Sequence, residues 1–212
     1  MNENIEDNQT IYAACFSESI DSLSQWRGYA QNGSGIAIGF SKKYLQAVNG
    51  LSPYNLKFNK VIYQNQEKFI DRIVEENLEN MKTKGIGHVG LELNQNYSLE
   101  FAQYKNPSFE EEKEWRMILR SKAGAQKIKR NFGGIEFSKR QYRYADGKII
   151  SYLEMNFSQI KQDIIKEIWI GPKSKISSTD IRDMLFEYGY YGDTPYNASE
   201  PIPIMYSKSS YR

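Results

Sequence analysis

The sequence predicts an α+β fold with a central mixed, mostly antiparallel sheet and flanking helices. Short apolar runs bounded by turn residues recur along the chain, as strands do. In residues 66–82 and 178–188 the apolar positions instead recur at helical spacing. Asp146-Gly147 is a hairpin-type turn, which joins antiparallel strands.

The predicted elements follow from local patterns along the chain. Alternating or continuous apolar runs predict strands, Ser and Asp predict helix starts, and Gly and Pro predict stops. In chain order the predictions are a strand at 11–17, a helical turn through Trp26 and Tyr29 capped by Ser19 or Asp21, a strand at 36–40, a helix at 42–48 capped by Ser41, a strand at 58–63, a helix at 66–82, a second helix from 91 or 95 to 104, strands at 114–119, 135–137, 141–144, 149–155 and 164–170, a helix to Tyr188 capped by Ser177 or Ser178, and an extended segment at 202–206.

Length and composition predict a single domain over residues 11–212, preceded by a flexible N-terminal end at 1–10. The 212 residues suffice for one good core. A net charge of +2 neither requires nor excludes a nucleic-acid partner. One cysteine and no apolar leader favour a reducing cytoplasm, and no apolar run approaches the roughly 20 residues that cross a bilayer.

Two segments contain the candidate site residues. The first, at 15–40, carries Ser17 and Glu18 at a strand end, followed by the Trp-Arg-Gly-Tyr cluster at 26–29. The second, at 109–116, carries Glu112, Glu114 and Arg116 at alternate positions before an apolar strand. Alternate residues of a strand share a face, so these three side chains are expected to point the same way.

A spaced set of short motifs runs through most of the chain: Cys15-Phe16-Ser17-Glu18, Trp26, Tyr29, Gly35, Ile38-Gly39-Phe40, Tyr104-Lys105, Glu112-Lys113-Glu114-Trp115-Arg116 and Ile168-Trp169-Ile170-Gly171-Pro172. In this set the chain resembles the bacterial domain-of-unknown-function family 2971. The family's upstream Asn-Asp-Pro-x-Glu element is not found here. The resemblance therefore implies a chain truncated at its N-terminus, or completed there by a partner chain. Its members appear among mobile and defence-associated genes, which implies a phage-defence or toxin setting.

The layout also resembles that of ADP-ribosyltransferases, by analogy alone. The analogy implies an enzyme that uses NAD as a substrate and modifies an unknown acceptor. Glu114 would be the catalytic carboxylate and Glu112 the second, because carboxylates stabilise positive charge at an anomeric carbon. Substrate-binding residues would be Ser17, Trp26, Tyr29 and Arg116.

Each of these residues also has a plainer interpretation. The glutamates are equally consistent with a solvated acidic turn in which Glu114 pairs with Arg116 or Lys105. Trp26 is as consistent with a core position, and Cys15 is expected to be inert core. One His and one Cys give little support to a metal or to a Ser-His-Asp triad. The rival function is a non-catalytic module that recognises a protein or nucleic-acid partner through its many tyrosines and the basic 122–130 segment.

Overall fold

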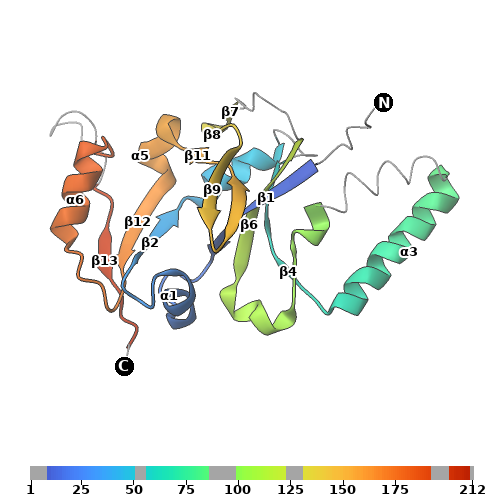
Figure 1. The fold of residues 1–212 in the computed structure, drawn as a ribbon, viewed down its shortest axis with the longest axis horizontal. Coiled ribbons are helices and arrows are strands. Elements are labelled where there is room, and N and C mark those ends of the chain that lie inside the picture. Colours follow the sequence, from blue (N-terminus) through green and yellow to red (C-terminus); the bar gives the residue numbers. More distant parts are fainter. Residues whose placement is uncertain (1–8, 51–55, 86–98, 123–130, 192–200, 211–212) are drawn as a thin grey trace. The chain divides into compact units, whose positions relative to one another are not determined.

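The computed structural model describes residues 9–50, 56–85, 99–122, 131–191 and 201–210 (Figure 1). The chain divides into two compact units. The first contains Met1–Glu18, Gln46–Arg130 and Phe137–Glu154, and the second contains Ser19–Leu45, Asn131–Glu136 and Met155–Arg212. Each unit is described by itself below.

The first unit is built on an antiparallel sheet of order β1-β6-β3. Its strands are β1 (Gln9–Ser17), β6 (Glu114–Lys122) and β3 (Leu56–Lys60). Apolar side chains at alternate positions of β3 and β6 cover one face, where Phe58 stacks on Trp115 with ring centroids 5.2 Å apart and meets Phe16 edge-on at 5.5 Å. Because side chains alternate along a strand, Glu114 and Arg116 of β6, with Cys15 and Ser17 opposite them on β1, lie on the other face.

A long helix and a short parallel strand pair extend this unit. The helix α3 (Gln66–Lys84) follows β4 (Ile62–Tyr63), and β4 pairs with β5 (Tyr104–Lys105). Phe69 of α3 is buried and stacks on Tyr104 at 4.8 Å. Between β5 and β6 lies the 3-10 helix η2 (Pro107–Glu112), and η1 (Ala47–Gly50) precedes β3.

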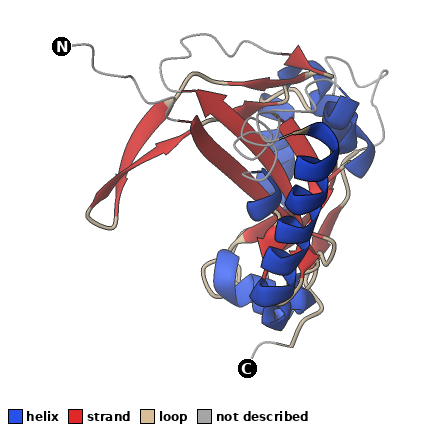
Figure 2. Cartoon of the chain, turned by 90° about the vertical axis from the view of Figure 1, so that its right-hand side faces the viewer, coloured by secondary structure: helices blue, strands red, loops and turns tan. Residues whose placement is uncertain are grey.

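The hairpin of β9 (Gln141–Ala145) and β10 (Lys148–Tyr152) completes the first unit. Asp146 and Gly147 both have positive φ, 50° and 76°, as a two-residue turn between right-twisted strands requires. In Figure 2 the hairpin is the two-stranded ribbon at the left. At its base Tyr12 donates a 3.2 Å hydrogen bond to Ser151, and Arg140 lies over the Tyr12 ring.

The second unit is built on a sheet of order β13-β12-β2. The strand β12 (Ile165–Ile170) pairs antiparallel with β2 (Ile36–Phe40) and parallel with β13 (Ile204–Tyr206). The helix α6 (Ser178–Glu187) packs Ile181 and Leu185 against β12. Further elements are α1 (Leu23–Tyr29), α2 (Lys42–Gln46), α5 (Lys161–Ile164), η3 (Ser158–Ile160), and the small sheet β11-β8-β7, from β11 (Met155–Asn156), β8 (Ile135–Phe137) and β7 (Asn131–Phe132).

A close backbone approach explains the glycine of the Ile168–Pro172 motif. Gly171 donates a 3.0 Å hydrogen bond to the Gly35 carbonyl. A Cβ at this position would meet the Gly33 carbonyl oxygen at less than contact distance and the Gly35 carbonyl oxygen at 2.8 Å. Only glycine therefore allows the end of β12 to pack against the turn before β2.

The α+β class and the mostly antiparallel pairing are confirmed, although the strands form several small sheets. Three predicted details are wrong. The N-cap of α1 is Ser22, because the Asp21 carboxylate instead accepts the Trp26 indole N–H. The strand predicted at 58–63 breaks at Val61, whose N–H bonds Glu114 while that of Ile62 bonds Gln103. The strand predicted at 11–17 begins two residues earlier, at Gln9, because Gln9 and Thr10 pair with Lys122 and Ser121.

Two other predictions stay predictions. Most of the second helix predicted before residue 104 lies outside the described residues, and Tyr104-Lys105 itself is a strand. The division into two units does not test whether residues 11–212 behave as one domain.

Candidate functional site

The acidic box forms a turn between a 3-10 helix and a strand. Asn106 caps η2 by accepting the Ser108 N–H at 2.9 Å, and Pro107 occupies the first position of the helix. Glu112 ends η2, Lys113 has a left-handed φ of 46°, and Glu114 begins β6. The two glutamates therefore do not alternate along one strand as predicted, and the turn at Lys113 sets their directions.

Lys105 nevertheless brings the two carboxylates together. Its ammonium nitrogen binds Oε2 of Glu112 and lies 2.9 Å from Oε2 of Glu114. The parallel pairing of β5 with β4 places Lys105 opposite Tyr63, whose hydroxyl accepts the Glu114 N–H at 2.8 Å. The sequence predicted Lys105 only as an alternative partner of Glu114. It did not predict that Lys105 binds both glutamates.

Arg116 completes the cluster on the same face of β6 as Glu114. Its Nε lies 2.8 Å from Oε1 of Glu114, and its Nη2 lies 3.2 Å from Oε2. Its Nη1 donates to the Ala102 carbonyl at 2.6 Å. The shared face and the ion pair are as the sequence predicted, and the guanidinium uses all three nitrogens within the unit.

Burial and charge act in opposite directions on these groups. Glu114 is only 4% exposed, and burial alone raises the pKa of its carboxyl. Hydrogen bonds from Arg116, Cys15 and Lys105 outweigh that cost and hold the pKa at about 2, below the ordinary 4.5. Burial lowers the pKa of Lys105, but its bonds to Glu112 and Glu114 raise it overall. The Glu114–Arg116–Lys105 cluster is thus fully charged at neutral pH.

The end of β1 lies against this cluster. Cys15 pairs with Arg116 and Ser17 with Glu114 in the register of the sheet. The Ser17 hydroxyl donates to the Glu112 carbonyl at 2.7 Å. Cys15 is exposed rather than in the core, because it alternates onto the face that carries Arg116 and Glu114. Although the residue as a whole is exposed, partial desolvation of its thiol beside the cluster and the adjacent Glu114 raise the pKa of the thiol to about 11.

Trp26 and Tyr29 belong to the second unit. Trp26 is 1% exposed and donates its indole N–H to Asp21 at 2.7 Å, which fits the core position that the sequence allowed. Tyr29 is 72% exposed at the end of α1. Because each unit is described by itself, a common hollow between these rings and Glu114 stays a prediction.

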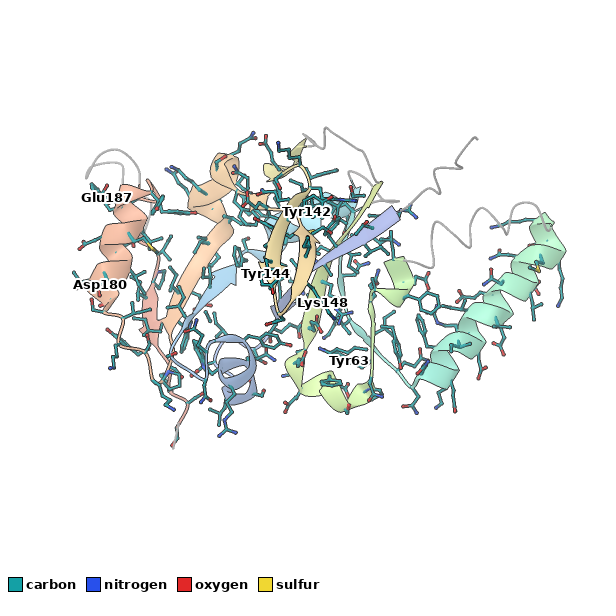
Figure 3. The ribbon with its side chains drawn as sticks, in the orientation of Figure 1. Tyr63, Tyr142, Tyr144, Lys148, Asp180 and Glu187 are labelled. Atoms are coloured by element: carbon teal, nitrogen blue, oxygen red, sulfur yellow. The ribbon has the colours of Figure 1, made fainter. Side chains whose placement is uncertain are left out.

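Sequence reasoning did not single out the exposed tyrosines of the β9–β10 hairpin. Tyr142 and Tyr144 are 63% and 78% exposed, and Lys148 lies on the facing strand (Figure 3). The signal was present in Gln141-Tyr142-Arg143-Tyr144 before Asp146-Gly147, where aromatic and basic residues alternate. Of the basic segment at 122–130 that was considered instead, Lys122 ends β6 and residues 123–130 lie outside the described residues.

Other site types find no counterpart in the part of the chain that the structure describes. No three or more His, Cys, Asp or Glu side chains gather there as a metal site would require. Nor does that part contain a helix long and apolar enough to span a membrane.

The comparisons with known proteins bear on family only. Residues 25–117 match the family described as "Protein of unknown function (DUF2971)", which confirms the resemblance. The matched stretch includes Trp26, Tyr29, Lys105 and the acidic box, while Ser17 and Gly171 lie outside it. Neither the curated proteins nor the solved structures contain a match to this chain.

Proposed function

We propose that the chain is a non-catalytic binding module that holds single-stranded nucleic acid on its β9–β10 hairpin. The observation that carries the proposal is the exposure of Tyr142, Tyr144 and Ile149, at 63%, 78% and 77%. Large side chains gathered on a narrow two-stranded ribbon are typical of an interaction surface.

The register of the hairpin places these side chains on one face. Tyr144 is opposite Ile149, and Tyr142 is opposite Ser151. Residues two apart on a strand are about 7 Å apart, so the two rings form a row along β9. Each phenol ring can stack one unpaired base, which favours a single strand over a duplex whose bases are already stacked.

The net positive charge of the hairpin favours binding of a polyanion. Residues 139–152 contain four basic side chains, Lys139, Arg140, Arg143 and Lys148, against one acidic side chain, Asp146. Arg140 is held at the base by the Tyr12 ring and by a 3.1 Å bond to Thr10. Arg143 and Lys148 lie on the opposite face from the tyrosines and, being long, can reach phosphates at the edges of the ribbon.

The ADP-ribosyltransferase-type activity stays a prediction with less support from the geometry. A carboxylate that stabilises an anomeric cation needs a negative charge that protein cations do not already neutralise. Both oxygens of Glu114 already bind Arg116 or Lys105. Incubation with labelled NAD tests this activity separately. Turnover of NAD by the wild type, together with loss of turnover in a folded Glu114→Gln variant, would establish the activity. The defence or toxin setting and the cytoplasmic location are proposed with either function.

Fluorescence anisotropy with labelled single-stranded RNA and DNA of mixed sequence tests the binding module. The wild type should bind, and affinity should fall as salt rises. Tyr142→Ser/Tyr144→Ser should lose at least roughly 30-fold in affinity, since stacking contributes about 1–3 kcal/mol per base and the double variant removes two rings. Arg143→Gln and Lys148→Gln should each reduce the slope of log affinity against log salt concentration by about one. A stronger response to RNA or to DNA identifies the natural class.

Tyr188→Ser is the matched control, because Tyr188 is 71% exposed at the end of α6 rather than on the hairpin. It should bind as the wild type does. Circular dichroism of each variant should match that of the wild type. The absence of binding at low salt, or equal affinity of the double variant, would overturn the proposal and leave a protein partner as the alternative.

A further inference from the structure

The helix α3 carries an apolar stripe that its own unit leaves exposed. Its inner face, with Phe69 and Ile73, is buried. A second row is exposed by about a third to a half: Ile70 42%, Val74 49%, Leu78 52% and Met81 36%. These positions recur at intervals of three and four residues, so they lie on one side of the helix over about 17 Å.

The charges beside the stripe are distributed unevenly along the helix. Glu67, Asp71 and Glu75 flank its first half, and Lys82 flanks its second half on the same side. Lys82 and Glu79 are 3.6 Å apart with both side chains more than two thirds exposed, so this ion pair contributes little and is easily exchanged. A parallel pair of such helices would place Asp71 beside Asp71, whereas an antiparallel pair places Asp71 beside Lys82.

From this pattern we infer that α3 pairs antiparallel with α3 of a second copy of the chain. Ile70 of one copy then lies near Met81 of the other, and Val74 near Leu78, so each apolar side chain meets another. A surface hollow whose described lining is Asn65, Gln66, Glu67 and Ile70 lies at the start of the helix, where Met81 of the second copy would enter. The inference is independent of nucleic-acid binding.

The stripe is short, which limits the strength of the pair. Four side chains on one helix from each copy should bury less than the roughly 1,000 Å² that a stable interface needs. The dimer is therefore weak and reversible, with a dissociation constant of roughly 10–500 μM. The charge pairs select orientation and partner more than they add affinity.

Sedimentation velocity over a concentration series of the whole chain tests the pairing. The wild type should shift from monomer toward dimer. Leu78→Glu should remain monomeric at every concentration, because it places a charge in the centre of the stripe. Phe186→Glu is the matched control, since Phe186 is an exposed apolar residue of another helix, α6, and it should dimerise as the wild type does.

Charge reversal then tests orientation. Asp71→Lys and Lys82→Glu should each weaken the dimer several-fold, and the double variant should recover affinity to within about threefold of the wild type. A wild type that is monomeric throughout, a dimer that survives Leu78→Glu, or a double variant weaker than either single variant would overturn the inference.

Discussion

Glu114→Gln removes the charge at the centre of the cluster with almost no change in side-chain size. Glu114 accepts bonds from Arg116 and Lys105 while only 4% exposed. Removing one partner of such a pair leaves uncompensated charge and costs about 3–5 kcal/mol. Lys105 keeps its bond to Glu112, so we expect the lower end, about 3 kcal/mol. The pKa gives a similar figure, because the difference between about 2 and 4.5 corresponds to about 3 kcal/mol.

Urea denaturation at pH 7, followed by circular dichroism, measures this loss. Glu111→Gln is the control, because Glu111 is an exposed residue of the same acidic run. It should change the free energy of unfolding by no more than about 0.5 kcal/mol. A loss below about 1 kcal/mol in Glu114→Gln would refute the reasoning that Glu114 stabilises the fold through its bonds to Arg116 and Lys105.

Three further predictions concern acid, the thiol and the glycine. Because the pKa of Glu114 is lowered on folding, its contribution is complete above pH 4.5 and is lost as the pH falls from 4.5 toward 2. In urea titrations the stability gap between the wild type and Glu114→Gln should therefore shrink by about 2–3 kcal/mol between pH 5 and 2.5, and a constant gap would contradict the coupling. With the Cys15 pKa at about 11, a disulfide reagent at pH 7.5 should label the thiol roughly 100-fold more slowly than an ordinary thiol, and the labelling should be faster in Glu114→Gln. Labelling of the wild type at the ordinary rate would show that the pKa of Cys15 is not raised. Gly171→Ala should lower the free energy of unfolding by about 2 kcal/mol or more, whereas Gly28→Ala, in a helix with open space around it, should raise it by up to about 1 kcal/mol. Equal melting temperatures of Gly171→Ala and the wild type would exclude the backbone clash.

Local patterns predicted much of the secondary structure because the chemistry that decides it is local. The apolar spacing of α3 and the Asp146-Gly147 turn act within a few residues. So does the capping box of α6, where Ser177 and Asp180 exchange hydrogen bonds. The break at Val61 could not be predicted this way, because it depends on a change of strand partner from β6 to β5.

The cluster shows the same limit at the level of the site. Alternation correctly put Glu114 and Arg116 on one face of β6. It misplaced Glu112, whose direction depends on the left-handed Lys113, and the burial of Cys15, which depends on the face of β1. That both glutamates bind one ammonium follows from the pairing of β5 with β4, which sequence spacing does not encode.

Photo-crosslinking tests the proposed binding surface most directly. A single-stranded oligonucleotide carrying 5-iodouracil is bound to the wild-type chain, irradiated, and mapped by mass spectrometry of the adducted peptides. We predict adducts on Tyr142 and Tyr144 that disappear at high salt. Adducts confined to exposed tyrosines elsewhere, such as Tyr29 or Tyr188, would contradict the account.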